Sequence, residues 1–265
     1  MNIGIIALGV VGSAVKHGLE RIGHNVRAYD IKLPDTSLAD VLETEICFLC
    51  VPTPPRDDGS CDISIVERTV GELNEADYQV VVVIKSTVIP GTTNRLAARY
   101  PKLNLAFCPE FLRERSAYTD FVEKHDVCVI GAYDVQHFEL IKQAHGALPK
   151  HIFHLTPLDA EFAKYFSNVF NALRIIFANE FYDVCKASGA NYAPIKQALV
   201  HRDTIEDVYL DCNENFRGFA GVCLPKDTAA FAAYVKQLGL DLKLFETIVE
   251  ENKRFRPSVP KGMRP

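Results

Sequence analysis

The sequence has little of what marks nucleic-acid-binding, membrane or secreted proteins. It contains no long basic run, and its formal net charge of -5 argues against a nucleic-acid-binding surface. No stretch approaches roughly 18 uninterrupted apolar residues, so no membrane span is expected. The apolar residues 1–15 carry no basic n-region and are interrupted by glycines, so we expect no targeting signal.

The eight cysteines also lack the dense spacing of a small disulfide-stapled scaffold. We therefore expect reduced thiols and a cytoplasmic location. Cys47 and Cys50 form a CxxC pair, but they lie in an apolar run, and no second Cys or His pair follows at zinc spacing. We interpret both as strand residues, and the sequence predicts no metal site.

The length of 265 residues allows one large or two medium domains. Short apolar runs predict strands at residues 2–7, 25–30, 46–51, 79–84, 104–107 and 127–131. Helical patterns fall between them, at residues 13–22, 63–73, 91–99 and 135–145. This alternation predicts an α/β fold, a Rossmann-like doubly wound parallel sheet, with its ligands at the C-terminal ends of the strands.

The first strand leads into a glycine-containing turn, Leu8-Gly9-Val10-Val11-Gly12. Asp30 ends the second strand, about 20 residues further on, where a dinucleotide-binding unit places the acid that binds the ribose hydroxyls. An acid there favours NAD over NADP. Ala7 stands where the first glycine of the fingerprint is expected, so an ordinary strand-turn-helix remains an alternative. The candidate cofactor contacts are Gly9, Val10, Val11, Gly12 and Asp30.

From Thr156 the alternation stops, and apolar residues at three- and four-residue spacing continue to about Ala187. Further helices are predicted at residues 193–201 and 240–254. We therefore predict an NAD-binding domain at 1–155, a small all-helical domain at 156–256 and a proline-rich tail at 257–265. Lys164 and Asn168 are four residues apart and share a helix face; they are either functional, or a solvated lysine and a helix contact.

The segment Gly218–Asp227 combines a glycine-rich turn with a predicted helix start at Pro225. Cys223 therefore lies at a helix N-terminus, where the positive helix-end potential and Lys226 favour a thiolate. Asp227 follows in the first turn. A buried, unreactive cysteine before an ordinary helix start is the alternative.

This segment resembles Gly-Phe-Gly-Gly-x-Cys-x-Pro-Lys-Asp of the nucleotide-sugar dehydrogenases, the family of UDP-glucose 6-dehydrogenase and GDP-mannose dehydrogenase. Three loops that follow predicted strands resemble the same family. Residues 51–54 are similar to its Val-Pro-Thr-Pro, residues 85–93 to its Lys-Ser-Thr-Val-x-Pro-Gly-Thr-Thr, and residues 108–117 to its Asn-Pro-Glu-Phe-Leu-x-Glu-Gly-x-Ala. In the last loop, Cys108 replaces Asn and Arg115 replaces Gly.

The resemblance implies an enzyme that uses NAD twice to oxidise a sugar CH2OH to a carboxylate, through a cysteine thiohemiacetal and thioester. It implies the catalytic residues Cys223, Lys164, Asn168, Asp227, Glu110 and Thr87. It adds as cofactor contacts Val51, Pro52, Thr53, Ser86, Thr87, Glu114 and Lys226. It implies as substrate contacts Phe111, Leu112, Glu114, Lys164, Asn168, Phe219 and Gly221. A nucleotide-sugar substrate and a homodimer formed through the helical domain are also implied.

The chain departs from the family pattern at several points. Ala220 replaces a glycine of the cysteine segment, and Thr204 stands where the family has an arginine that reaches the neighbouring subunit's substrate. We also expect the family's C-terminal nucleotide-binding domain to be missing. Two functions therefore stay open: an NAD-dependent nucleotide-sugar 6-dehydrogenase, or an impaired NAD-binding module that acts as an assembly or regulatory partner.

Overall fold

The computed structural model describes residues 1–255, and the tail predicted at 257–265 lies outside them. The chain divides into two units: residues 1–54 with 61–164, and residues 55–60 with the chain from Tyr165 onward. In the described residues, none of the helices is long and apolar enough to cross a membrane.

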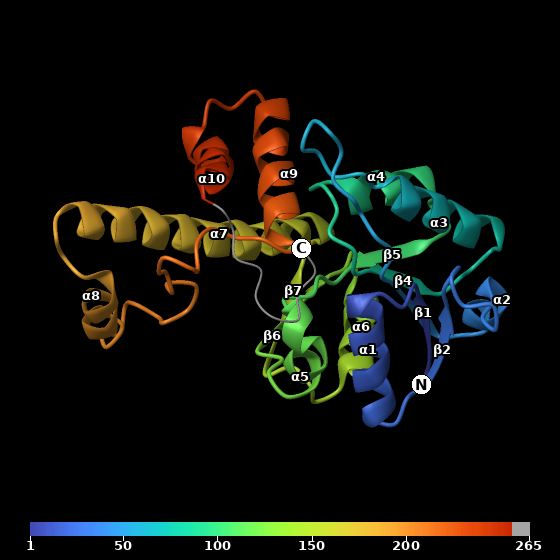
Figure 1. The fold of residues 1–265 in the computed structure, drawn as a ribbon. Coiled ribbons are helices and arrows are strands. Elements are labelled where there is room, and N and C mark those ends of the chain that lie inside the picture. Colours follow the sequence, from blue (N-terminus) through green and yellow to red (C-terminus); the bar gives the residue numbers. More distant parts are fainter. Residues whose placement is uncertain (256–265) are drawn as a thin grey trace. The chain divides into compact units, whose positions relative to one another are not determined.

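The first unit is built on a seven-stranded sheet with the strand order β2-β1-β3-β4-β5-β6-β7 (Figure 1). The strands are β1 (Asn2–Ile6), β2 (Asn25–Tyr29), β3 (Ile46–Leu49), β4 (Val81–Ile84), β5 (Asn104–Phe107), β6 (Val127–Gly131) and β7 (His151–Leu155). Every residue of β3 and β4 is buried, as expected for strands that are covered on both faces. The predicted Rossmann-like doubly wound fold is confirmed.

One strand pair differs from the predicted parallel sheet. The strands β5 and β6 are antiparallel, and they pair through a single pair of residues, Phe107 and Gly131. The connection between them carries only a short 3-10 helix, η1 (Glu114–Ser116), and α5 (Ala117–Val122). A parallel neighbour requires a crossover that returns the chain to the starting edge of the sheet. This connection does not make that return.

The other helices of the first unit are α1 (Val10–Arg21), α2 (Leu38–Leu42), α3 (Ser64–Glu75), α4 (Thr92–Arg99) and α6 (Val135–His145). The buried face of α1 packs Ala14, Val15 and Leu19 into the same core cluster as Ile3 and Ile5 of β1. These contacts fix the start of α1 at the C-terminal end of β1, where the glycine turn lies.

The second unit is helical. Its elements are most of α7 (Pro157–Ala187), then α8 (Tyr192–Leu199), α9 (Leu224–Gln237) and α10 (Lys243–Arg254). Phe219, which precedes α9, is buried in a cluster with Val169 and Ile176 of α7 and Ile248 of α10. The glycine-rich segment is therefore part of the core of this unit.

Candidate functional site

The turn after β1 keeps a glycine-like backbone although it begins with alanine. Ala7 has a φ of 71°, in the left-handed region that glycine adopts without steric cost. Its N–H donates to the Tyr29 carbonyl at 2.7 Å. A Cβ on Gly12 would lie 2.0 Å from the Ala7 carbonyl oxygen, so Gly12 is required for α1 to approach the turn. The fingerprint geometry is therefore formed despite Ala7.

The residues of this turn fit a dinucleotide pyrophosphate. Gly9 is the N-cap of α1, where unpaired backbone N–H groups and the helix dipole attract a phosphate. A Cβ on Gly9 would meet nothing within 4 Å, so space is open above the helix end. Asp30 follows β2 at the same end of the sheet, and its carboxylate accepts a hydrogen bond from the Leu8 N–H at 2.7 Å. Val10 and Val11 are half-buried in the first turn of α1.

The next two loops lie against each other. The Ser86 hydroxyl, which follows β4, donates to the Val51 carbonyl, which follows β3, at 2.7 Å. The thiol of Cys61 donates to the carbonyls of Thr53 and Thr87, at 3.8 and 3.6 Å. Val51, Thr53, Ser86 and Thr87 are thus brought together at the C-terminal edge of the sheet, as predicted for ligand-binding loops. Pro52 is exposed in the same loop.

Glu110 lies between two buried lysines of the first unit. Its carboxylate forms an ion pair with Lys85. Its backbone carbonyl accepts a hydrogen bond from Lys164 Nζ at 2.6 Å, and that ammonium lies 5.6 Å from the centre of the Phe111 ring. Burial alone would lower the pKa of Lys85, but Cys108 and the Glu110 carboxylate raise it above the ordinary value. The Glu110 carboxylate therefore favours the charged ammonium form of Lys85.

A salt bridge between Arg113 and Asp120 stabilises the loop that continues from Glu110. Asp120 accepts hydrogen bonds from the backbone and guanidinium of Arg113, at 2.8 to 2.9 Å, and from the Ser116 hydroxyl at 3.0 Å. Leu112 and Glu114 flank Arg113 and are half-buried. This arrangement fixes the segment that carries the predicted substrate contacts.

In the second unit, two predicted residues donate hydrogen bonds to the carboxylate of a third, Asp227. Asp227 is buried, and its two oxygens accept hydrogen bonds from Asn168 Nδ2 at 2.6 Å and from Lys226 Nζ at 2.5 Å. Cys223 is exposed and is the N-cap of α9, with Pro225 in the first turn, as predicted. Cys223 and Asp227 therefore begin the same helix, within one turn of each other.

The glycine-rich segment before Cys223 is held from two sides. Gly218 and Gly221 have φ values of 58° and 84°, whereas Ala220 lies outside the left-handed region, so its Cβ causes no backbone strain. The Asn252 side chain of α10 accepts from the Phe219 N–H at 2.8 Å and donates to its carbonyl at 2.9 Å.

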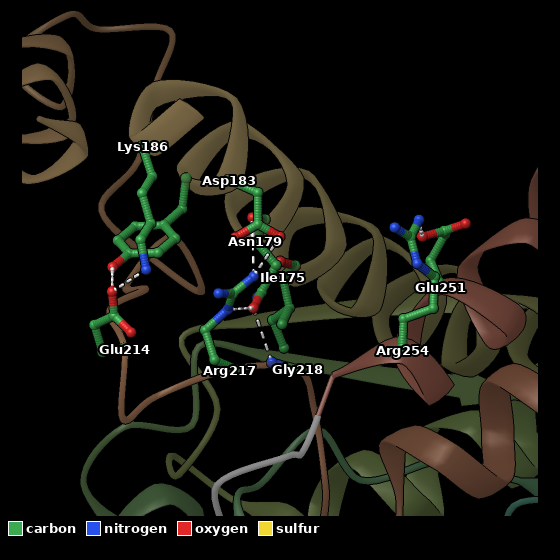
Figure 2. A network of polar contacts seen from close by, with 10 residues as sticks. Ile175, Asn179, Asp183, Lys186, Glu214, Arg217, Gly218, Glu251 and Arg254 are labelled. Carbon is green, nitrogen blue, oxygen red and sulfur yellow. Dashed lines mark hydrogen bonds and ion pairs between the residues drawn. The ribbon is translucent and has the colours of Figure 1, made fainter. Parts of the chain in front are cut away.

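The second anchor comes from α7. The side-chain amide oxygen of Asn179 accepts from the Gly218 N–H at 3.0 Å and from Arg217 Nε at 2.7 Å, and Arg217 also pairs with Asp183 at 2.8 Å (Figure 2). Sequence reasoning did not find Asn179, Arg217 or Asn252, because their partners lie more than 30 positions away and no motif links them. In the sequence, Lys85 stands out only as part of the loop pattern at residues 85–93.

The candidate residues thus form several groups, each within one unit. In the first unit these are the α1 turn with Asp30, the loops after β3 and β4, and Glu110 with Lys164 and Phe111. In the second unit they are Asn168, Lys226 and Asp227, with Cys223, Phe219 and Gly221 on the segment that starts α9.

Comparison with known proteins identifies the family. The family model described as UDP-glucose/GDP-mannose dehydrogenase family, NAD binding domain, matches residues 32–148, and the model of the family's central domain matches residues 158–254. The UDP-glucose 6-dehydrogenase of Rickettsia prowazekii is 31% identical, over 97% of this chain and 68% of that protein. The chain belongs to the UDP-glucose/GDP-mannose dehydrogenase family. Solved structures agree: a UDP-glucose dehydrogenase from Pyrobaculum islandicum has a TM-score of 0.87 and 30% identity, over 96% of this chain and 68% of that one.

Family membership confirms part of what the sequence predicts. The expected class, an NAD-dependent dehydrogenase with a Rossmann-like fold, is confirmed. The GDP-mannose 6-dehydrogenase of Pseudomonas aeruginosa is 27% identical over 95% of this chain and 68% of that protein, so relatives with different sugar nucleotides are similar at this level. The residue roles, the domain boundaries, the homodimer and the cytoplasmic location stay predictions.

Proposed function

We propose that the protein oxidises the CH2OH group of a nucleotide sugar to a carboxylate, using two molecules of NAD in turn and Cys223 as a covalent nucleophile. The observation that carries the proposal is the start of α9. An exposed cysteine lies at the helix N-terminus, and one turn later a buried carboxylate is bound by Asn168 and Lys226. The helix dipole at that position favours a thiolate, which is the nucleophilic form.

The first oxidation converts the alcohol to an aldehyde. When bound, NAD accepts hydride from the sugar carbon, once in each oxidation step. In our proposal, a water held by Asp227 and Thr87 takes the hydroxyl proton and passes a proton to the Asp227 carboxylate. Asp227 suits this task because Asn168 and Lys226 fix both of its oxygens.

The covalent step follows. The Cys223 thiolate adds to the aldehyde carbon, and the carbonyl oxygen becomes an alkoxide. We assign Lys164 and Asn168 to this alkoxide, because an ammonium and an amide N–H that are already held in place stabilise developing negative charge. Loss of the second hydride then leaves a thioester on Cys223.

Hydrolysis completes the reaction. We propose that Glu110 takes a proton from the attacking water, which adds to the thioester carbon and releases the sulfur and the carboxylate product. The ion pair with Lys85 fixes the orientation of the Glu110 carboxylate.

We further propose that the protein forms a homodimer through α7. Five large apolar side chains of this helix are exposed by 40% to 75%: Phe166, Phe170, Phe177, Phe181 and Val184. At about 100° per residue, they fall within an arc of roughly 60° on one side of the helix. Such a stripe is costly to leave in water, and a second copy of α7 offers a matching apolar surface.

Steady-state formation of NADH tests the proposed function. UDP-glucose, GDP-mannose and the free sugars would each be supplied with NAD. The proposal predicts two NADH per molecule of the accepted nucleotide sugar, and no turnover by the Cys223→Ser variant. If the protein binds NAD but forms no NADH with any of these compounds, the impaired-module alternative is supported instead.

A further inference from the structure

A cluster of three potential metal ligands lies in the core of the first unit, outside the proposed catalytic groups. Cys108 directly follows β5, Cys128 lies in β6 and His145 is the last residue of α6. The side chains are 0%, 1% and 0% exposed, respectively. Their sulfur and nitrogen atoms all lie within 4.8 Å of one another. The sequence shows no zinc spacing here, because each ligand comes from a different element.

The distances are close to those of a tetrahedral zinc site. Zn–S bonds of about 2.3 Å and Zn–N bonds of about 2.0–2.1 Å place two sulfurs about 3.8 Å apart, and a sulfur and a nitrogen about 3.5 Å apart. The two cysteine sulfurs are 3.7 Å apart, and Cys108 Sγ lies 4.0 Å from His145 Nε2. The third pair, Cys128 Sγ and the His145 nitrogen, lies within 4.8 Å.

The histidine ring is oriented as in a metal ligand. Its Nδ1 lies 2.8 Å from the Ile141 carbonyl oxygen. Because a carbonyl only accepts, Nδ1 carries the proton in this bond, and the Nε2 lone pair faces the sulfurs. Metal-bound histidines show this pattern, in which the second ring nitrogen donates to a carbonyl or carboxylate.

The charges around the cluster also balance with a divalent ion. Lys85 Nζ lies 3.4 Å from Cys108 Sγ, and it is paired with the Glu110 carboxylate. That pair is neutral. Two thiolates and one Zn²⁺ add up to zero as well, so the occupied site carries no net charge in the dry interior.

We propose that Cys108, Cys128 and His145 form a buried zinc site. Two sulfurs and a nitrogen suit zinc, and three protein ligands are the set of an open zinc site, whose fourth position takes a small molecule. The ion would link the end of β5 and strand β6 to α6. The antiparallel strands β5 and β6 are paired through only one residue pair. A metal ion that links them would therefore stabilise this strand pair most. Since the ligands meet only in the folded chain, zinc would bind during folding.

Metal analysis of the full chain tests the proposal. The wild type would be expressed with added zinc, purified without chelator, and measured by mass spectrometry of its metal content. We expect one zinc per chain. We expect at least a tenfold lower zinc content in Cys128→Ser, and an unchanged content in the matched control Cys47→Ser, which alters another fully buried strand cysteine.

Cobalt provides a second measurement that does not need the variant to fold. The wild type, unfolded and refolded with Co²⁺, should show thiolate-to-cobalt charge-transfer absorption, and Zn²⁺ should displace it. The proposal is overturned if the wild type binds neither metal in a one-to-one ratio. It is equally overturned if Cys128→Ser keeps the zinc of the wild type. Neither result depends on dehydrogenase activity.

Discussion

At Gly9, an added methyl group is expected to weaken cofactor binding without affecting folding. Its φ of -70° is open to alanine, and a Cβ there would meet no protein atom within 4 Å. We expect Gly9→Ala to fold but to bind NAD at least tenfold more weakly, because the methyl group would occupy the approach of the pyrophosphate to the helix end. Titration with NAD, together with urea unfolding, measures both effects.

Gly12→Ala provides the contrast. Its Cβ would lie 2.0 Å from the Ala7 carbonyl oxygen, so we expect the loss of stable folding rather than of NAD affinity alone. If Gly9→Ala binds NAD as tightly as the wild type, the assignment of the α1 N-terminus as the pyrophosphate site is wrong.

Asp120 is expected to stabilise the loop after Glu110 in a pH-dependent way. Burial raises its pKa, but the hydrogen bonds from Arg113 and Ser116 outweigh burial and hold the pKa below the usual range. The stabilisation is therefore complete above the unfolded pKa of about 3.9, and it is lost as the pH falls through the lower folded pKa. We expect Asp120→Asn to cost roughly 1.5–3 kcal/mol at pH 7.

Urea unfolding at pH 7, 5 and 3 measures this effect. The difference between wild type and Asp120→Asn should persist from pH 7 to 5 and shrink at pH 3. The exposed Asp35→Asn serves as the control, with little change expected. A difference that grows on acidification would contradict the assigned role of Asp120.

Individual residues were predictable where a short motif carries them. Cys223, Asp227 and Gly12 lie in local patterns, and the structure places Cys223 at a helix N-terminus as the pattern indicates. The partners of Asp227 were only partly predictable. The four-residue spacing of Lys164 and Asn168 gives a shared helix face, but not the hydrogen bond from Asn168, because its acceptor lies 59 residues away.

At the scale of elements, the segment that leads into α9 depends on α10. Asn252 is bound to both backbone groups of the buried Phe219, so Asn252→Ala would leave a buried N–H and a buried carbonyl without this partner. We expect a loss of stability of about 1–3 kcal/mol and a kcat at least tenfold lower, with NAD affinity unchanged. Urea unfolding, initial rates and NAD titration measure the three quantities.

Two further variants sharpen the test. Asn252→Asp keeps the acceptor for the Phe219 N–H and should give an intermediate kcat. Thr247→Ala changes an exposed residue of the same helix and should behave as the wild type. An Asn252→Ala protein with unchanged kcat would show that this anchor does not position Cys223.

Elements were predictable where the pattern is strong and local. The long helix that ends at Ala187 follows from apolar residues at three- and four-residue spacing, and the buried strands β3 and β4 follow from short continuous apolar runs. The sequence pattern does not predict the strand β7, because His151–Leu155 has neither a continuous apolar run nor a strict polar–apolar alternation and is largely exposed at the sheet edge. The direction of β6 could not be predicted either, since strand pairing is set by tertiary contacts that no local pattern encodes.

At the scale of the whole molecule, the exposed stripe of α7 predicts assembly. Phe177 is 57% exposed near the middle of the stripe. We expect Phe177→Glu to shift the protein from dimer to monomer, because a charge would be buried in an apolar interface. Sedimentation velocity at a series of concentrations measures the change. The control is Leu244→Glu on α10, which is similarly exposed, at 50%, and should leave the dimer intact. A wild type that stays monomeric at all concentrations would contradict the proposed interface.

The central claim is that Cys223 holds the sugar during oxidation, and a trapped adduct tests it most directly. Wild type and Glu110→Gln would be mixed with NAD and UDP-glucose, quenched in acid, digested and analysed by mass spectrometry. We expect the mass of the sugar nucleotide thioester on the peptide that contains Cys223, and more of it in Glu110→Gln, because thioester hydrolysis would be slowed. NADH formation with Cys223 unmodified at every quench time, or with the adduct on another cysteine, would contradict the account.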